Sequence, residues 1–246
     1  MTAPVFVVEH FDAGGGGRYV LDGPEGRHAV SVKRLRAGED VVLTDGSGRW
    51  ADCVVLGTEG KDRLVLQLDS VHEEPAEQPR VTVVQALPKG DRGELAVETM
   101  TEVGVDAIVP WAAARCITQW KGERGAKALG KWRATAREAG KQSRRVRFPE
   151  VAEAATTKQV AALLAGAEFA AVLHESGDAP LVTAELPSTG EIVLVVGPEG
   201  GVAPEELALF EEAGAKAYRL GRSVLRTSTA GTAAAAVLLA RTGRWS

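Results

Sequence analysis

The chain has 246 residues, of which 45% are hydrophobic and 25% are charged, and its formal net charge is −4. These values are typical of a soluble globular protein with one large or two modest domains, and they give no global basic signal for nucleic acid. The two cysteines, Cys53 and Cys116, lack metal-ligand spacing and indicate a reduced, cytosolic chain. No secretory leader is predicted, and the longest apolar run, residues 233–240, is too short to span a bilayer. We therefore expect a cytoplasmic protein.

The first 70 residues are predicted to form a small β-barrel, because short β-like runs alternate there with turns. The predicted strands are residues 5–8, 18–21, 40–44, 49–56 and 63–68. Residues 45–48 (DGSG) are typical of a hairpin turn. Residues 72–79 are acidic, contain two prolines and lack apolar periodicity, so they are predicted to be a linker.

After the linker, strands alternate with helices, which predicts a mostly parallel sheet covered on both faces. The predicted strands are residues 81–87, 107–111, 169–173, 192–196 and 217–220. The predicted helices are residues 93–103, 123–143, 205–213 and 228–241. The sequence thus indicates an α+β protein with two domains, residues 1–73 and residues 80–246.

A glycine-rich loop follows the apolar strand at 192–196, with the sequence GPEGG at residues 197–201 and a helix start after it. Such a loop lets bare backbone groups approach a small ligand closely, although a tight turn without a ligand is the alternative. No Gly-Lys-Ser/Thr ends the loop, and its glycine spacing differs from a dinucleotide fingerprint.

Residues 220–230 (LGRSVLRTSTA) form a second loop of this kind, in which Arg222 and Arg226 flank polar residues. Thr227 or Ser228 is predicted to cap the helix that follows. The two loops together are predicted to wall one pocket. A third strand ends at Leu173, followed by His174 and Glu175, although a lone histidine there is more often structural. The four histidines have no ligand spacing, so no metal site is predicted.

The segment from Arg115 to Arg147 holds eleven basic residues against two acids, while the whole chain is acidic. On a helical wheel most of these cations fall opposite Leu129 and Trp132. A solvated helix face is one interpretation, but a surface that binds a polyanion such as RNA explains the missing acids better. Lys33, Arg34 and Arg36 form a second basic cluster.

Several short motifs, in this order and spacing, make the chain resemble the bacterial 16S rRNA (uracil-N3)-methyltransferases of the SPOUT superfamily. They are residues 28–36 (HAVSVKRLR), 44–48 (TDGSG), 85–91 (QALPKGD), 101–105 (TEVGV), 138–145 (EAGKQSRR), 197–201 (GPEGG) and 225–227 (LRT). The chain departs from the family pattern at Ser228, where a Glu is usual, at Thr99, where a Lys is usual, and at Val103, where a Leu is usual.

The resemblance implies a PUA-like RNA-binding β-barrel, residues 1–73, and an α/β SPOUT methyltransferase domain with a trefoil knot, residues 80–246. It also implies a homodimer, S-adenosyl-L-methionine as donor, and methylation of N3 of one uridine in 16S rRNA or the small ribosomal subunit. Neither a membrane nor a metal is expected as a partner.

The candidate site residues fall into three groups, of which the resemblance implies the first. Those expected to bind the donor are Leu173, His174, Glu175, Val196, Gly197, Pro198, Glu199, Gly200, Gly201, Leu220, Gly221, Ser223 and Leu225. Arg226 is expected to stabilise charge on the uracil. Glu199 and His174 both have suitable chemistry for a general base, and Glu199 is the preferred candidate, although an alternative role for Glu199 is to orient the loop by accepting backbone N–H bonds. Those expected to bind RNA are Lys33, Arg34, Arg36, Arg124, Lys127, Lys131, Lys141, Arg144 and Arg145.

Other functions remain open on the sequence alone. A non-catalytic RNA-binding or ribosome-assembly protein would need the barrel and the basic helix but not the glycine loops. A knotted methyltransferase that acts on another RNA position or on a ribose hydroxyl is a second alternative. A nucleotide-dependent kinase or hydrolase fits least, because the phosphate-loop lysine is missing.

Overall fold

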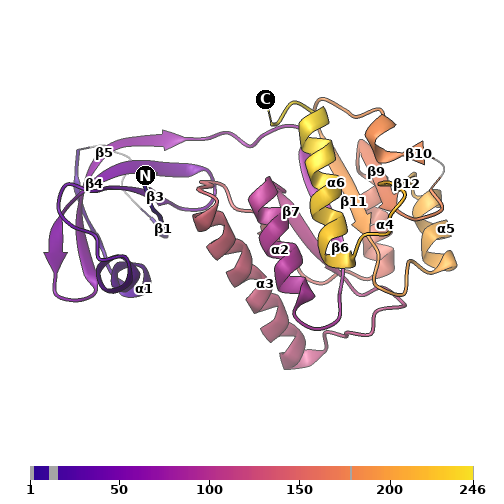
Figure 1. Cartoon of the computed structure of the whole chain (residues 1–246), viewed down its shortest axis with the longest axis horizontal. Helices are drawn as coiled ribbons and strands as arrows, with labels where there is room; N and C mark the ends of the chain where they lie inside the picture. Colours follow the sequence, from indigo (N-terminus) through magenta and orange to yellow (C-terminus); the bar gives the residue numbers. More distant parts are fainter. Residues whose placement is uncertain (1–2, 11–15, 178, 246) are drawn as a thin grey trace. The chain divides into compact units, whose positions relative to one another are not determined.

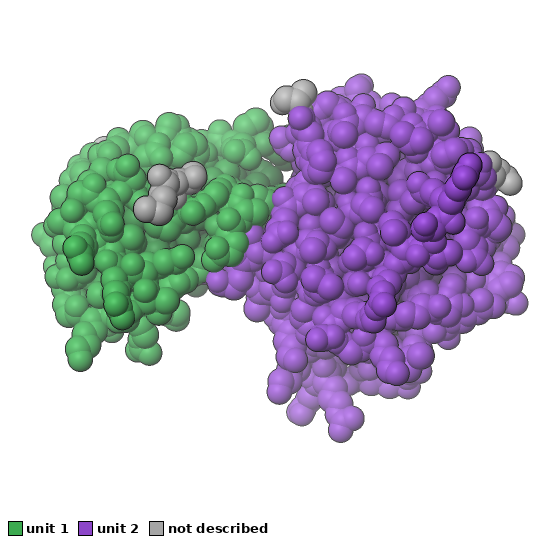
Figure 2. Space-filling model, in the orientation of Figure 1, with its two compact units in different colours: residues 1–76, 140–148 green, residues 77–139, 149–246 purple. Residues whose placement is uncertain are grey.

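The structure, a computed structural model, describes residues 3–10, 16–177 and 179–245. It divides into two compact units (Figures 1 and 2). Unit 1 consists of Met1–Ala76 together with Gly140–Phe148, and unit 2 consists of Glu77–Ala139 together with Pro149–Ser246. Unit 1 is therefore discontinuous in sequence, because it includes a segment that lies within the predicted second domain.

Unit 1 is built on a sheet whose strands, in the described part of the chain, pair in the order β1-β3-β4-β5-β2. These strands are β1 (Val5–Val7), β2 (Arg18–Leu21), β3 (Asp40–Thr44), β4 (Arg49–Glu59) and β5 (Arg63–Glu73). All neighbours are antiparallel except β1 and β3. Alternate side chains such as Phe6, Leu43 and Leu66 form the core. A short helix α1 (Gly23–Arg27) and a π-helical turn η1 (His28–Val32), which the sequence did not predict, follow β2.

The segment 140–148 packs within unit 1 through both backbone and side-chain contacts. The backbone N–H of Phe148 donates to the carbonyl of Gly46 (2.8 Å), and the Thr44 hydroxyl donates to the carbonyl of Val146 (2.8 Å). The Lys141 ammonium lies 2.9 Å from the Glu25 carboxylate, and these side chains are only 5% and 13% exposed. This corrects the prediction that Lys141 contacts RNA phosphates, because its charge is paired inside the unit.

Unit 2 contains a sheet whose described strands pair in the order β10-β12-β9-β11-β6-β7-β8, every neighbouring pair being parallel. Its strands are β6 (Arg80–Ala86), β7 (Ala107–Trp111), β8 (Glu150–Val151), β9 (Phe169–Leu173), β10 (Ala179–Pro180), β11 (Glu191–Val196) and β12 (Lys216–Arg219). The central strands are apolar on both sides, as a covered parallel sheet requires.

Helices cover both faces of this sheet (Figure 1). They are α2 (Arg92–Val103), α3 (Gly122–Gln142), α4 (Thr157–Ala165), α5 (Pro204–Glu212) and α6 (Thr227–Arg241), with a 3-10 turn η2 (Leu181–Thr183). Side chains of β11 alternate between two cores: Leu194 packs with α2, α3 and α6, whereas Val195 packs with α4 and α5. The helix α4 was missed by the sequence analysis, although Thr156 and Gln159 form a capping box at its start.

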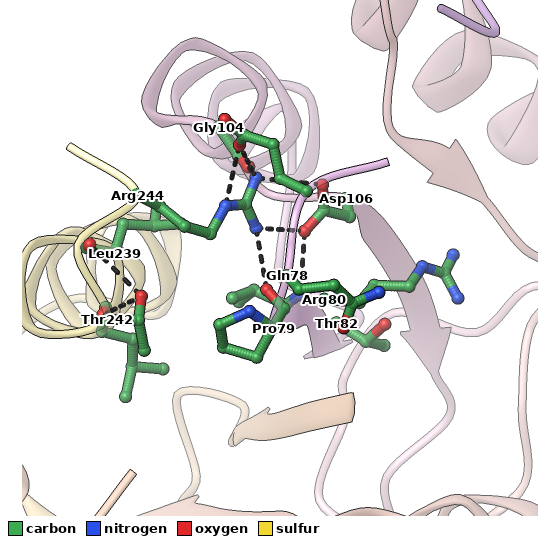
Figure 3. Close-up of polar contacts among 12 residues, drawn as sticks. Gln78, Pro79, Arg80, Thr82, Gly104, Asp106, Leu239, Thr242 and Arg244 are labelled. Carbon is green, nitrogen blue, oxygen red and sulfur yellow. Dashed lines mark hydrogen bonds and ion pairs between the residues drawn. The ribbon is translucent and has the colours of Figure 1, made fainter. Parts of the chain in front are cut away.

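A polar network joins the amino ends of the strands of unit 2 (Figure 3). The Arg244 guanidinium, 5% exposed, forms ion pairs with Asp106 and Glu77, each at 2.5 Å, and donates to the carbonyls of Pro79 and Gly104. Burial alone would lower the pKa of Arg244, but the hydrogen bonds and charges of Asp106 and Glu77 raise it overall. The C-terminal segment is thereby tied to the segment that leads into β6.

Candidate functional site

Three neighbouring parallel strands of unit 2, β12, β9 and β11, have their carboxyl ends at one edge of the sheet. The loops that follow these strands line a cavity of about 570 Å³. Ligands of open parallel sheets bind outside the carboxyl ends of the strands, and this volume is typical of a small-molecule site. The cavity is therefore the candidate functional site.

The structure places both predicted glycine-rich loops in the wall of this cavity. All thirteen residues that the sequence assigned to donor binding line it, together with Arg226. The sequence analysis did not assign a role in the cavity to several further lining residues: Arg92, Arg115, Val202, Tyr218, Arg219, Arg222, Val224, Thr227 and Ala230.

Thr227 connects the second loop to the first through its side-chain hydroxyl. Its hydroxyl donates to the carbonyl of Gly197 (2.8 Å) and accepts a hydrogen bond from the side-chain amide of Gln85 (3.0 Å). The prediction that Thr227 or Ser228 caps α6 is wrong, because Arg226 is the N-cap residue and makes no side-chain capping bond. Gln85 and Thr227 are both buried, so this contact fixes the end of β6, the first loop and the start of α6 together.

The glycines of the cavity have different steric surroundings. Gly201 has a positive φ of 73°, which favours glycine. A Cβ added to Gly197 would lie 2.9 Å from Val202, and one added to Gly200 would lie 3.2 Å from Arg115. A Cβ at Gly221 would meet no atom within 4 Å. Since Gly221 lines the cavity, a side chain there would occupy ligand space rather than protein space.

Glu206, in the first turn of α5, positions one wall of the cavity. Its carboxylate is buried and accepts hydrogen bonds from the backbone N–H groups of Ala114 (2.8 Å) and Ala203 (3.2 Å), and from the hydroxyl of Thr157 (2.9 Å). The segment after β7 is thereby held against the glycine loop. Arg115 in that segment donates to the carbonyl of Gly200 (3.1 Å). Sequence spacing gave no signal for this contact between distant segments.

Five arginines line the cavity against two glutamates, Glu175 and Glu199, so its lining carries more positive than negative side chains. Arg115 and Arg219 are anchored by hydrogen bonds to backbone carbonyls, those of Gly200 and Gly177 respectively. Arg92, Arg222 and Arg226 form no ion pair or side-chain hydrogen bond with any residue that the structure describes. The unpaired guanidiniums are therefore available to an anionic ligand.

Two groups at the cavity could exchange protons. Glu199 is exposed and accepts one hydrogen bond, from the backbone N–H of Lys89 (3.1 Å). His174 accepts the backbone N–H of Ser176 at its Nδ1 (3.3 Å), so in the neutral ring the proton is on Nε2. Nε2 is then a donor. This geometry favours Glu199 over His174 as a proton acceptor.

The residues predicted to bind RNA are divided between the two units. Lys33, Arg34 and Arg36 are exposed in unit 1, and Arg34 has a positive φ of 56°. Arg144, exposed, donates to the carbonyl of Ala3, and Arg145 is half-buried, both within unit 1. Arg124, Lys127 and Lys131 are exposed on α3 in unit 2. The predicted RNA-binding residues thus belong to both units.

Other site chemistries find little support in the described residues. No group of three or more metal-ligating side chains occurs among them. Burial raises the pKa of the Cys53 thiol to about 12 and also raises the pKa of the Cys116 thiol, so neither is a ready thiolate at neutral pH. No helix within the described ranges is long and apolar enough to cross a membrane.

The chain is similar to known RNA methyltransferases in both of its parts. A family model described as "RNA methyltransferase domain" matches residues 75–239, and one described as "RNA methyltransferase PUA domain" matches residues 21–69. The chain is 48% identical over 232 residues to a Mycobacterium bovis protein named "Ribosomal RNA small subunit methyltransferase E", covering 92% of this chain and 87% of the relative.

Two solved structures are similar over almost the whole chain. One is the ribosomal RNA small subunit methyltransferase E from Neisseria gonorrhoeae bound to S-adenosyl methionine, with 28% identity and a TM-score of 0.85. The other is a putative methyltransferase from Legionella pneumophila in complex with the same cofactor, with 27% identity and a TM-score of 0.85. Each comparison covers 98% of both chains.

Proposed function

The chain belongs to the RNA methyltransferase family matched over residues 75–239, and from that premise we propose that it methylates N3 of one uridine in 16S ribosomal RNA with S-adenosylmethionine as donor. The observation that carries the proposal is the cavity at the carboxyl ends of β9, β11 and β12, where both glycine-rich loops meet. The relatives named for the small ribosomal subunit support the class of RNA. The uridine and its N3 position follow from the motif resemblance.

The residues present fit the proposed donor. Gly221 leaves open space where any larger side chain would stand, and the loops bring backbone groups to the cavity wall. Val196 and Leu225 add apolar surface. When bound, the donor supplies an electrophilic methyl group on a sulfonium centre. We propose that the residues assigned from sequence, from Leu173 to Leu225, hold it there.

The acceptor chemistry assigns roles to two side chains. Uracil N3 carries a proton on the base-pairing edge, so the base must be unpaired before it can react. The Glu199 carboxylate would accept that proton, which leaves N3 with the lone pair that a methyl acceptor requires. The Arg226 guanidinium, which has no described ion-pair partner, would stabilise negative charge on the uracil oxygens.

Four further features belong to the same proposal. The exposed cations Lys33, Arg34 and Arg36 of the PUA-like unit, together with the exposed cations of α3, would bind the phosphates of the RNA backbone. A homodimer would cover exposed apolar residues such as Val224, which is 79% exposed. The trefoil knot and the cytoplasmic location, both implied by the resemblance, stay predictions.

The test is incubation of the protein with radiolabelled S-adenosylmethionine and small ribosomal subunits that lack the modification, followed by digestion and nucleoside identification. We expect label in 3-methyluridine. Label in another modified base would show that the methylated position is not uridine N3. Label on a ribose hydroxyl would favour a knotted methyltransferase that modifies ribose. If the protein bound RNA tightly but neither bound the donor nor transferred label, the alternative function of a non-catalytic RNA-binding protein would be favoured.

A further inference from the structure

A second cavity of about 410 Å³ lies in unit 2, beside α3. We call it the α3 cavity; its lining residues are Pro88, Gly90, Gly93, Glu94, Thr118, Trp120, Arg124, Lys127, Ala128, Lys131 and Trp132. The proposed donor and uracil chemistry does not use it. Its size is that of a small-ligand site, and its wall combines aromatic rings with cations.

The cations of the α3 cavity come from one face of α3. Arg124, Lys127 and Lys131 are spaced three and four residues apart, so their side chains lie on the same side of the helix. All three are exposed, and none forms an ion pair or side-chain hydrogen bond with a residue in the described ranges. Among the described lining residues, Glu94 is the one acidic side chain that offsets these three positive charges. This wall is suited to an anion.

The aromatic part of the wall is formed by Trp120 and Trp132. Their rings meet edge to face, with centroids 5.0 Å apart. Trp132 is only 2% exposed, yet its indole N–H donates to no described acceptor. A Cβ at Gly93 would lie 2.6 Å from that nitrogen and 2.7 Å from a neighbouring ring carbon, so the Trp132 ring packs directly against this glycine, which also lines the cavity. Trp120 is half-buried, so its ring supplies aromatic surface that a planar ligand can contact.

The α3 cavity adjoins the candidate active site. Arg92 lines the first cavity and the next residue, Gly93, lines the second. Likewise the backbone N–H of Lys89 holds Glu199 of the first cavity, while Pro88 and Gly90 line the second. The first turn of α2 therefore separates the cavities. This helix begins without a side-chain cap, and its free N–H groups add positive potential between them.

We propose that the α3 cavity binds a nucleotide that flanks the methylated uridine in single-stranded RNA. The base would stack on the half-buried Trp120 ring, which Trp132 supports from the core, and the backbone phosphates would be held by Arg124, Lys127 and Lys131. Stacking on aromatic side chains combined with cations along the backbone is the usual chemistry of single-strand binding. The inference rests on the proposed function, since the occupant is the same RNA strand whose uridine enters the first cavity.

The first test removes two charges from the full-length protein with the double variant Lys127→Ala/Lys131→Ala. We expect its dissociation constant for a short uridine-containing single-stranded RNA, measured without donor, to rise roughly tenfold, and the slope of log K against log salt to fall by about 0.7 for each lost contact. The dissociation constant for S-adenosylmethionine and the midpoint of thermal unfolding should not change.

The matched control is Lys158→Ala/Lys216→Ala, which removes two exposed lysines of unit 2 that line neither cavity. An equal loss of RNA affinity in the control, or no loss in the first variant, would overturn the proposal. A change in the oligomeric state of the first variant, measured by sedimentation, would also overturn the proposal. Such a change would show that this surface contacts a second copy of the chain rather than RNA.

The second test locates the base on the wild-type protein. Short RNA carrying 5-iodouridine next to the target uridine is photo-crosslinked, and the protein is digested with trypsin. We expect crosslinked peptide 116–121, which contains Trp120. The Trp120→Leu variant should lose at least about fivefold in RNA affinity, whereas Trp120→Phe should stay within about twofold. Crosslinks confined to other peptides would overturn the proposal.

These outcomes are separable from those of the methylation assay. A wild-type protein that methylates rRNA but never crosslinks at residues 116–121 would refute the α3 cavity as a nucleotide site and leave the enzyme assignment intact. A protein that crosslinks there but transfers no methyl group would refute the proposed reaction alone.

Discussion

The two ends of the seven-stranded sheet of unit 2 differ in how they treat charge. At the amino ends, the Arg244 guanidinium forms ion pairs with Asp106 (Figure 3) and with Glu77. The Arg244 side chain is 5% exposed. At the carboxyl ends, Arg92, Arg222 and Arg226 have no described ion-pair partner, and glycines replace side chains. The charges at one end are paired within the protein, whereas guanidiniums at the other end lie unpaired beside the cavity. Substitutions at the two ends should therefore affect different measurements.

The largest effect is expected at the amino ends, from Arg244→Ala. It would leave Asp106, which is 11% exposed, as an unpaired buried charge, and we expect the free energy of unfolding to fall by about 3–5 kcal/mol. Chemical denaturation measures this loss. The control Arg80→Ala removes an arginine that is 40% exposed and should cost below about 1 kcal/mol. Equal losses in the two variants would contradict the role given to burial.

At the carboxyl ends, Arg226→Ala is expected to lower kcat for RNA methylation by roughly 10²–10³-fold, because a charge-stabilising donor is lost in the transition state. The free energy of unfolding and the donor dissociation constant should stay unchanged, since Arg226 is exposed and has no described ion-pair partner. Arg226→Lys, which keeps the charge but loses the planar donor pair, should recover only part of the rate. Full turnover in Arg226→Ala would remove this residue from the mechanism.

A Gly221→Val substitution tests the donor cavity itself. The new side chain would enter open space, so we expect the dissociation constant for S-adenosylmethionine to rise roughly a hundredfold with little change in unfolding. Isothermal calorimetry measures the affinity. Gly57→Val is the matched control, because a Cβ at Gly57 in unit 1 also meets no atom within 4 Å. Unchanged donor affinity in Gly221→Val would place the donor elsewhere.

The smallest effect is expected at Thr227, whose hydrogen bonds hold the cavity loops and should therefore affect both stability and donor binding. Thr227→Val would remove the hydroxyl that bonds Gly197 and Gln85, and we expect about 1–3 kcal/mol lower stability together with a few-fold weaker donor binding. Thr227→Ser keeps the hydroxyl and should restore both. If Thr227→Val changed stability but left donor affinity unaltered, the contact would be purely structural.

Local pattern was enough to predict most of the elements. The strand predicted at 107–111 is β7 itself, and the glycines at 197 and 221 marked the loops that now line one cavity, because strand ends and glycine turns are encoded by neighbouring residues. Contacts between distant segments were not accessible in this way. Nothing near Arg115 indicates that it bonds Gly200, and nothing near Glu206 indicates that it receives the backbone of Ala114.

Lys141 illustrates the same limit in the opposite direction. On the helical wheel it belongs with the other cations of α3, so its sequence position predicts an exposed charge. The partner that buries it, Glu25, is 116 positions away in the chain. A periodic pattern reports which face of a helix is polar, but it does not report whether another part of the fold covers that face.

The discontinuity of unit 1 has a consequence for the order of folding during synthesis. Residues 140–148 supply a buried cation for Glu25 and backbone partners for the turn after β3, so the amino-terminal unit is incomplete until the ribosome has translated residue 148. Translation delivers residues in order, whereas this unit needs its last segment from the middle of the chain. A nascent chain halted at residue 76 would therefore carry a half-finished first unit, and an isolated 1–76 fragment should be less resistant to proteolysis than the same residues in the full protein.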